Sequence, residues 1–406
     1  MTATAPAPVY PSLEGSEDPF PFLNHLREHQ PVYQIPDRPN IYLLTRYDDV
    51  KRALSEWSTF SNTEARSGLS GIWFGGGPED ATMINELDPP LHRPQRVLAQ
   101  APIAPGRLRS YVTLITELVD GLIDRFIDDG STEFVSAFAH QLPLKLTMQL
   151  LGIPESDMDW IITWTSFESS GLSWMPDEFR EGQKVHAQKM LSYLSDMLLE
   201  RLENPGDDVI SFVVQEQVGR EGEFKMPQAR AISAMLLAGG VITTAHFMAS
   251  ALLLLLQHRD QMAKVRADTS LIPRMLEECL RLQGPVLWQP RRMAVEIELH
   301  GITIPKGSHV LLMQAAANRD PAKFAEPDRF HVDRPDVMDH LGFGFGEHFC
   351  LGAPLARLES RIAFERLFAR LADIRLIEPQ RIEHIRSPQF RGVRSLNIEF
   401  DAAAQD

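Results

Sequence analysis

The chain has 406 residues, of which 44% are hydrophobic and 23% are charged, a composition that is ordinary for a soluble protein with a large core. Its formal net charge of −15 argues against a nucleic-acid partner and against a polybasic membrane anchor. The only two cysteines, Cys279 and Cys350, do not form a secreted disulfide framework and favour a reducing cytoplasm.

Residues 1–20 are rich in proline, alanine and acidic residues and are predicted to form an extended arm. No basic segment followed by an apolar core occurs there, which predicts neither a signal peptide nor an N-terminal anchor. No linker divides residues 21–406, so we expect one large domain.

The first helix is predicted over 22–29 and contains His25 and His29 in the H-x-x-E-H arrangement of inverted zinc peptidases. Two imidazoles at i and i+4 share a helix face and could bind zinc. No nearby residue supplies a convincing third ligand, so a solvated helix face is favoured over a zinc peptidase. A strand pair at 32–33 and 41–45 and a helix at 49–56 follow.

An irregular stretch from 65 to 85 carries three consecutive apolar side chains beside a run of glycines. The run lacks the Gly-Lys-Ser/Thr ending of a phosphate-binding loop. Long irregular segments with apolar side chains are usually lids or binding loops. We therefore expect Ile72, Trp73 and Phe74 to cover a substrate.

A helix that begins near Leu91 places His92 and Arg96 four residues apart and therefore on one face. Two such donors could bind a pair of carboxylates. The spacing of apolar residues then predicts further helices at 111–127, 141–151, 157–167 and 177–203.

The longest helix is predicted over 227–259, and its middle is almost uncharged. It is long enough to span a membrane, but a helix that is apolar all round is the buried centre of a large soluble protein. The adjacent Gly239 and Gly240 each cost about 1 kcal/mol relative to alanine, which indicates close approach by another group. Thr243 can bond back to the carbonyl of either glycine, and such bonding bends a helix and opens a groove.

A helix at 270–283 contains Glu278 and Arg281, an acid and a base at i and i+3 that alone would indicate only a surface pair. The segment Arg291-Arg292-Met293-Ala294 then leads into a small hairpin that turns at Gly301.

The stretch from Phe343 to Gly352 presents Cys350 inside a glycine-punctuated loop. Glycine permits unusual backbone angles and close approach of a large flat group, so several backbone N–H groups can point at one sulfur. A helix predicted over 353–370 directs the positive end of its dipole at the same sulfur. Cys350 is therefore the predicted metal ligand, although a lone cysteine is more often a buried free thiol.

The pattern Phe343-Gly344-x-Gly346-x-His348-x-Cys350-x-Gly352 resembles the complete cysteine-loop signature of the bacterial haem-thiolate monooxygenases, the cytochrome P-450 family. The resemblance implies a mainly α-helical fold with small β-sheets, a single large domain that encloses one non-covalently bound haem b. In that family the cysteine is the proximal iron ligand, and its thiolate favours cleavage of the O–O bond. The cofactor-binding residues that the resemblance implies are His92, Arg96, Gly239, Gly240, Arg292, Phe343, His348 and Gly352.

The resemblance also places Thr243 at the catalytic alcohol position of an oxygen-binding groove. It implies a buried ion-pair network beneath the cysteine loop, formed by Glu278, Arg281 and Arg329. The predicted substrate pocket is apolar and favours a hydrophobic, aromatic or terpenoid-like substrate. Its residues are Ile72, Trp73, Phe74, Met235, Leu287, Trp288 and Phe390.

One position departs from the family pattern, because Ile242 stands where an aspartate or glutamate usually precedes the threonine. Isoleucine can neither donate nor relay a proton. His246 shares the helix face of Thr243, and Glu359 occupies a family position that can approach that part of the helix. We hypothesise that His246 and Glu359 form a proton relay; the alternative is a buried histidine satisfied by a carbonyl.

The resemblance implies insertion of one oxygen atom into an organic substrate, with electrons that start from reduced nicotinamide and arrive through a ferredoxin reductase and a ferredoxin. A basic docking face is predicted from Arg93, Arg107, Arg109, Arg357 and Arg361, and the chain is expected to be a monomer without a membrane partner. The alternatives are an atypical haem-thiolate enzyme that uses peroxide or substrate-assisted protonation, and a haem sensor or carrier without turnover.

Overall fold

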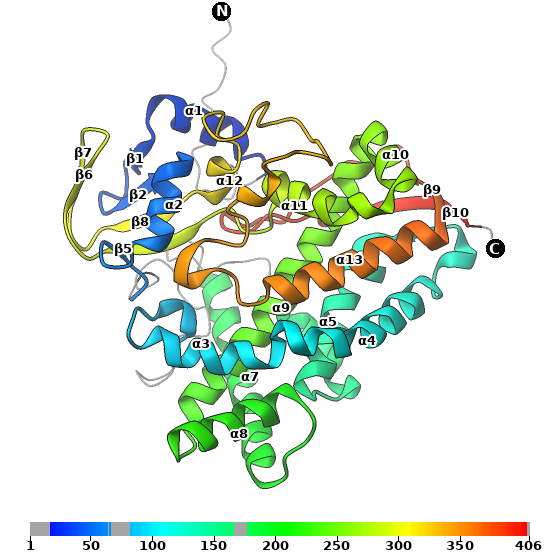
Figure 1. Ribbon diagram of the computed structural model, residues 1–406, viewed down its shortest axis with the longest axis horizontal. Coiled ribbons are helices and arrows are strands. Elements are labelled where there is room, and N and C mark those ends of the chain that lie inside the picture. The colour runs from blue at the N-terminus through cyan, green and yellow to red at the C-terminus, as the bar shows by residue number, and fades with distance from the viewer. Residues whose placement is uncertain (1–16, 64, 66–81, 166–176, 404–406) are drawn as a thin grey trace, which may run out of the picture.

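The computed structural model describes residues 17–63, 65, 82–165 and 177–403. Most of these residues are helical, and the helices pack around a long central one (Figure 1). The helices are α1 (Phe20–His29), α2 (Tyr47–Ser55), α3 (His92–Gln100), α4 (Pro105–Ile123), α5 (Gln141–Leu151), α6 (Met158–Thr165), α7 (Asp177–Glu203), α8 (Val209–Glu221), α9 (Met226–Gln257), α10 (Arg259–Ala267), α11 (Ile272–Gln283), α12 (Gln314–Ala317) and α13 (Ala353–Arg370).

Three small sheets complete the described part of the fold. The largest has the order β1-β2-β8-β5-β3, with β2 and β8 parallel and the other neighbours antiparallel. A second sheet has the order β4-β10-β9, and β6 pairs with β7 as a hairpin at one edge of the molecule (Figure 1). The strands are β1 (Val32–Gln34), β2 (Ile41–Leu44), β3 (Phe60–Ser61), β4 (Ser131–Glu133), β5 (Gln289–Met293), β6 (Ile297–Leu299), β7 (Ile302–Ile304), β8 (His309–Leu312), β9 (Leu371–Leu376) and β10 (Asn397–Ala402).

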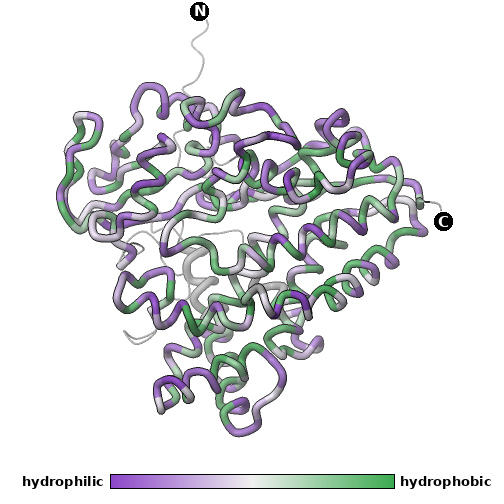
Figure 2. The backbone as a smooth tube through the Cα atoms, in the orientation of Figure 1, coloured by the Kyte–Doolittle hydropathy of each residue, from purple (hydrophilic) through white to green (hydrophobic). Residues whose placement is uncertain are grey.

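Most residues of the central helix α9 are apolar and buried against neighbouring elements. It packs against α5, α7 and α11 and crosses α13 (Figure 1). By length and hydropathy it would suffice to cross a membrane, but 78% of its most apolar window is buried inside the protein. Figure 2 shows this green, hydrophobic course running through the middle of the fold. The expectation of a buried core helix is therefore confirmed.

The helices predicted at 141–151, 177–203 and 353–370 have the observed bounds of α5, α7 and α13. Helix α8 was not predicted, although its start is marked by Asp208, whose side chain accepts a hydrogen bond from the Ser211 N–H at 2.7 Å. Its end is marked by Gly222 in the left-handed conformation. Both caps are local signals that can be read from the sequence.

Candidate functional site

The cysteine loop is held by its own backbone and by α2. Gly344 and Gly346 have φ values of +76° and +74°, a region that favours glycine. A Cβ on Gly346 would lie 3.0 Å from the Ser55 Cα, so the loop also needs glycine there for its close approach to α2. The Cys350 N–H donates to the Phe343 carbonyl at 2.7 Å. The sulfur is therefore carried on a tightly defined turn just before α13.

The Cys350 sulfur borders a cavity and is otherwise surrounded by protein. Burial raises the pKa of this thiol, while hydrogen bonds from the Gly352 and Ala353 backbone N–H groups and the cations of Arg96 and Arg357 favour the thiolate. The backbone donors stand at the first turn of α13, as the sequence predicted. The loop can thus supply an anionic sulfur ligand once a metal replaces the thiol proton.

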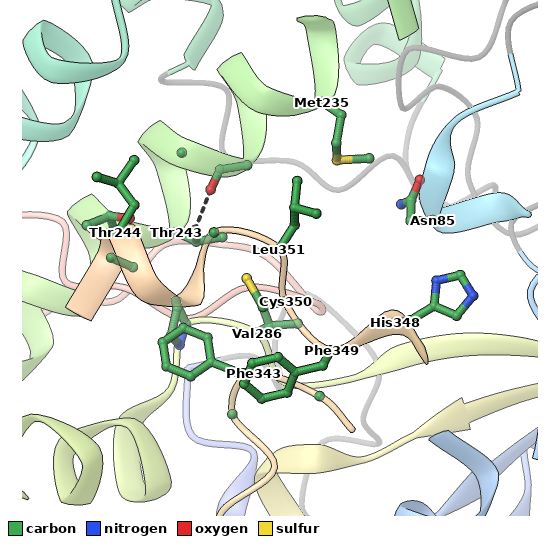
Figure 3. Close-up of a pocket in the computed structure, with 18 of the residues that line it drawn as sticks. Asn85, Met235, Thr243, Thr244, Val286, Phe343, His348, Phe349, Cys350 and Leu351 are labelled. Atoms are coloured by element: carbon green, nitrogen blue, oxygen red, sulfur yellow. Dashed lines mark hydrogen bonds between the residues drawn. The ribbon is translucent and has the colours of Figure 1, made fainter. Parts of the chain in front are cut away.

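The cavity has a volume of about 330 Å³ and separates the cysteine loop from α9. Figure 3 shows the Cys350 sulfur facing it from one side, while Met235 and Thr243 of α9 lie on the other. Thr243 and Thr244 lie at one end, and His348 and Asn85 lie toward the other end (Figure 3). A flat group of the size implied by the resemblance would lie between the loop and the helix.

The two glycines of α9 serve different purposes. The Thr243 hydroxyl donates to the Gly239 carbonyl at 2.8 Å, which confirms the predicted back-bonding (Figure 3). A Cβ on Gly239 would meet no atom within 4 Å, because this residue faces the cavity. A Cβ on Gly240 would lie 2.9 Å from the Thr147 hydroxyl oxygen, so Gly240 allows α5 to pack closely on α9.

The donor side chains that line the cavity include His92, Arg96, Arg291 and His348. The imidazole rings of His92 and His348 lie 4.1 Å apart, and the Nε2 atom of each is buried without a hydrogen-bond partner. Arg96 donates to the Phe349 carbonyl at 2.8 Å. Burial and then the neighbouring His92 lower the pKa of His348 to about 3. This donor set fits the two carboxylates of haem, which would satisfy the orphaned nitrogens.

The prediction for Arg292 is corrected by the strand register. In β5, Arg291 is buried and lines the cavity, whereas Arg292 lies on the opposite face of the strand. Arg292 Nη1 contacts His309 Nε2 at 2.6 Å instead. Sequence reasoning chose the wrong member of an adjacent arginine pair, and Arg291 takes the place that it assigned to Arg292.

Two predicted pocket residues do not line the cavity. Leu287 and Trp288 are buried in the apolar core beside α1 and do not line the cavity, and the Trp288 indole N–H donates to the Pro388 carbonyl at 2.7 Å. Met235 and Phe390 do line the cavity, together with the unpredicted Val286. The remaining predicted pocket residues, Ile72, Trp73 and Phe74, lie outside the described residues.

Asn85 is a polar residue of the cavity that the sequence did not single out. It lies on a short 3₁₀ turn at 84–86, before α3, and its Oδ1 atom is buried without a hydrogen-bond partner. Figure 3 shows it across from Met235. Its position at the end of the predicted binding loop, 65–85, was the available signal.

His246 does not lie where the proton-relay hypothesis requires. It does not line the cavity but packs against His140, with ring centroids 5.7 Å apart, and against Gly392, where a Cβ would overlap its ring. Burial and then His140 lower its pKa to about 3, so it is neutral, and its Nδ1 has no partner. The His246 part of the hypothesis is therefore corrected.

Glu359, in contrast, lines the cavity from α13. Its side chain is buried, and its Oε1 atom has no hydrogen-bond partner. Burial raises the pKa of this carboxyl to about 8. Glu359 is thus a carboxylic acid that stays protonated near neutral pH and faces the cavity.

The predicted ion-pair network exists with one different member. Glu278 and Arg281 have fully buried side chains joined at 2.7 Å. The second arginine on Glu278 is Arg334, at 2.9 Å from Nε to Oε1. Arg329 instead makes a 3.2 Å pair with Glu326 in which both side chains are 64% exposed. The predicted side-chain role of Arg329 is contradicted, because its guanidinium points outward. Its backbone carbonyl nevertheless accepts hydrogen bonds from Arg281 at 3.3 Å and from Arg334 at 3.0 Å.

The zinc hypothesis gains no support from the N-terminal histidines. The His25 and His29 rings stack 4.5 Å apart, and His29 Nδ1 contacts the His25 carbonyl at 3.0 Å. Among residues 17–63, 65, 82–165 and 177–403, no group of three or more His, Cys, Asp and Glu side chains could hold a metal ion.

Comparison with known proteins agrees with the resemblance. A family model described as Cytochrome P-450 matches residues 163–372. The chain is 33% identical to 6-deoxyerythronolide B hydroxylase of Saccharopolyspora erythraea over 93% of this chain and 94% of that one. It is 34% identical to Vitamin D(3) 25-hydroxylase of Pseudonocardia autotrophica over 89% and 88% of the two chains.

Among solved structures, CYP109E1 from Bacillus megaterium in complex with testosterone matches with a TM-score of 0.87 and 25% identity, covering 96% of this chain and 99% of that one. The mainly helical fold with small sheets, the cysteine loop facing the central helix and the extent of these matches agree with one another. The chain therefore belongs to the cytochrome P-450 family, whose members are haem-dependent monooxygenases.

Proposed function

We propose that this protein inserts one atom of dioxygen into a hydrophobic small organic molecule, by hydroxylation, epoxidation or oxidative dealkylation, with Cys350 as the proximal ligand of haem b. The observation that carries the proposal is the Cys350 sulfur facing the Thr243 groove of α9 across one cavity. Bound haem supplies the activation of dioxygen and the oxygen transfer, which a thiolate ligand promotes.

On the side of the cysteine loop, the protein would hold the Cys350 sulfur and the two carboxylates of haem. The Phe343 carbonyl fixes the Cys350 N–H, and the first backbone N–H groups of α13 stabilise the thiolate. At the cavity wall, His92, Arg96, Arg291 and His348 are the proposed propionate ligands. Their burial makes them costly without an anion, so binding of the two carboxylates is favourable.

Leucine replacement of Arg291 is expected to weaken haem binding by roughly 10- to 100-fold, because a charge-assisted hydrogen bond contributes about 1.5–3 kcal/mol. The matched control is Arg292→Leu, which removes the same side chain from the other face of β5 and should leave haem affinity unchanged. Haem transfer to apomyoglobin measures the difference. Equal haem loss from both variants would contradict the assignment.

Protons are proposed to reach dioxygen by a route that does not need an acid at position 242, where this chain has isoleucine. The Thr243 hydroxyl donates to the Gly239 carbonyl, which leaves its oxygen free to accept a hydrogen bond in the cavity. Glu359 holds a proton near neutral pH on the same cavity wall. We assign proton handling to Thr243 and Glu359, with His246 outside the path.

Glu359→Gln is expected to stabilise the fold at pH 8 and to divert reduced nicotinamide from oxygenated product to peroxide. Since the folded-state pKa of about 8 exceeds the ordinary 4.5, the folded protein binds more protons than the unfolded chain between these values, and stability falls as pH rises through that window. Glu359→Gln removes this loss, which is on the order of a few kcal/mol. Urea unfolding at pH 4 should show equal stability for the two proteins, and at pH 8 the variant should be the more stable.

The same variant should release more peroxide per reduced nicotinamide oxidised. An unchanged peroxide yield would remove Glu359 from the proton path.

The substrate is proposed to be a hydrophobic molecule with a polar group. Met235, Val286 and Phe390 supply apolar walls, and Asn85 supplies an amide whose Oδ1 lacks a partner. Such a lining suits an oxygenated carbon skeleton, in keeping with the 6-deoxyerythronolide B, vitamin D(3) and testosterone in the names of the related proteins. The proposed role is in secondary metabolism or in catabolism.

Electrons are proposed to come from reduced nicotinamide through a ferredoxin reductase and a ferredoxin, to a monomeric protein in the cytoplasm. Arg93, Arg107 and Arg109 are exposed and suit an acidic partner. The other two predicted docking residues are already paired, Arg357 with Glu277 and Arg361 with Glu365. Docking is therefore assigned to the first three.

The test is turnover of haem-loaded protein with a surrogate ferredoxin, its reductase and labelled dioxygen, on compounds chosen because they shift the iron from low spin to high spin. One oxygen-18 atom in the product supports the proposal. Label incorporated only from labelled peroxide favours a peroxide-driven enzyme, the second candidate that Ile242 suggests. The absence of both a spin-state change and a product across the compound set would favour a haem sensor or carrier.

A further inference from the structure

A second ion pair, with a buried carboxylate and an arginine whose side chain is 34% exposed, lies near the cysteine loop. Glu277 of α11 and Arg357 of α13 form a two-bond fork, with Nε to Oε1 at 2.7 Å and Nη2 to Oε2 at 2.8 Å. His340 Nε2 also lies 2.8 Å from Glu277 Oε2. The side chains of His340 and Glu277 are only 2% and 6% exposed. These three residues, the Glu277 triad below, are separate from the Glu278–Arg281–Arg334 network.

The hydrogen-bond pattern defines the charge of the triad. The Gly342 N–H donates to His340 Nδ1 at 3.0 Å, so Nδ1 is an acceptor and Nε2 carries the single ring proton. His340 is therefore neutral and donates to the carboxylate. Although burial opposes it, hydrogen bonds from Arg357 and His340 hold the pKa of Glu277 at about 2, so Glu277 is ionised. One negative and one positive charge remain, and the triad is neutral overall.

The cation of the triad contacts the cysteine loop, as does His340, whose ring centroid lies 6.1 Å from that of Phe343. The Arg357 guanidinium carbon lies 4.6 Å from the centroid of the Phe343 ring. The Phe343 carbonyl accepts the Cys350 N–H, and Figure 3 shows the Phe343 ring just below the sulfur. Glu277, Phe343 and Arg357 all border the cavity into which Cys350 faces. The sulfur thus lies in the field of a cation whose charge is balanced by one carboxylate.

We propose that the Glu277–Arg357 pair, oriented by His340, sets the reduction potential of the haem iron through the charge experienced by the Cys350 sulfur. This inference rests on the proposed haem-thiolate function. An unbalanced cation near the ligand favours the electron-rich ferrous state, and an unbalanced carboxylate disfavours it. The neutral pair holds the potential between these extremes. His340 acts as a positioning residue, because it touches the carboxylate and not the iron ligand.

The test is the ferric–ferrous midpoint potential of haem-loaded variants, measured by spectroelectrochemical titration. Glu277→Gln leaves the guanidinium unbalanced and should raise the potential. Arg357→Gln leaves the carboxylate unbalanced and should lower it. Each shift should be about tenfold in the ferrous-to-ferric ratio at fixed applied potential, or about 59 mV for one electron. The double variant should return close to the original value.

Arg361→Gln is the matched control, because it removes an arginine one turn along α13 whose partner is the exposed Glu365. It should shift the potential by much less. If Glu277→Gln or Arg357→Gln fails to retain haem, two more conservative variants test the same inference. Arg357→Lys keeps the positive charge and should leave the midpoint potential near the original value. Glu277→Asp should raise the midpoint potential slightly.

Shifts of the same sign in Glu277→Gln and Arg357→Gln, or shifts no larger than that of Arg361→Gln, would overturn the inference. So would an Arg357→Lys potential as low as that expected for Arg357→Gln. Failure of the proposed function is recognised separately: the unmodified protein, reduced with carbon monoxide, would then lack the red-shifted Soret band of a thiolate ligand. A normal red-shifted Soret band together with unchanged midpoint potentials in the variants would contradict only the proposed role of the triad.

Discussion

Cys350→His is expected to abolish the red-shifted Soret band of the reduced, carbon monoxide-bound protein and to reduce oxygenation of substrate to background. Histidine offers a neutral nitrogen in place of a thiolate, so the electron density that favours O–O cleavage is lost. The cationic cavity wall is untouched by this change, and haem should still bind. Absorption spectra of the reduced protein with carbon monoxide, together with product analysis, measure both effects.

The control for this change is Cys279→Ser, since Cys279 is the other cysteine of the chain and is buried in α11 beside Met275. Its thiol faces the apolar core, so the variant should keep the thiolate spectrum and lose only stability. Retention of the red-shifted band in Cys350→His would show that another residue ligates the iron and would remove the basis of the proposed function.

Arg334→Ala is expected to destabilise the fold by about 3–5 kcal/mol, because it removes one of the two cations that balance the fully buried Glu278. Arg334 also donates to the carbonyls of Ala325, Glu326 and Arg329, and these hydrogen bonds would be lost with its side chain. Haem content should fall with stability, because only the folded chain forms the cavity. Urea unfolding followed by circular dichroism and the haem-to-protein absorbance ratio measure the two losses.

Arg329→Ala supplies the comparison, because its partner Glu326 is as exposed as Arg329 itself. An exposed pair of this kind contributes about 0–1 kcal/mol, so the variant should unfold almost as the original protein does. If Arg329→Ala proved the more damaging of the two, the network would have to be assigned to Arg329 after all.

The long helices could be predicted from the sequence because each carries many residues of consistent pattern. The bounds 141–151, 177–203 and 353–370 needed no tertiary information. The cysteine loop was equally readable, because Gly344 and Gly346 adopt backbone angles that the pattern of glycines implies. The helix predicted at 111–127 is instead observed as α4, which begins at Pro105 and ends at Ile123, and α8 was missed although Asp208 and Gly222 mark its two ends.

The errors at the site share a physical cause. Adjacent residues of an extended segment point to opposite sides, so a one-residue ambiguity exchanges Arg291 for Arg292 and Val286 for Leu287. Only the pairing of β5 with β8 resolves that choice. Arg334 and Arg329 lie in an irregular segment, where no period indicates the direction of a side chain. His246 shares a helix face with Thr243 in projection, but Gly392 and His140 close around it.

The buried imidazole nitrogens of His92 and His348 have a consequence for the life of the chain in the cell. Haem that binds the folded chain and not the unfolded one stabilises the folded state, so a chain that has folded without pigment lies closer in free energy to partly opened forms. Proteases act on such forms. We therefore expect the amount of this protein to follow the supply of iron porphyrin, with starved cultures showing rapid turnover of newly made chains in a pulse-chase experiment.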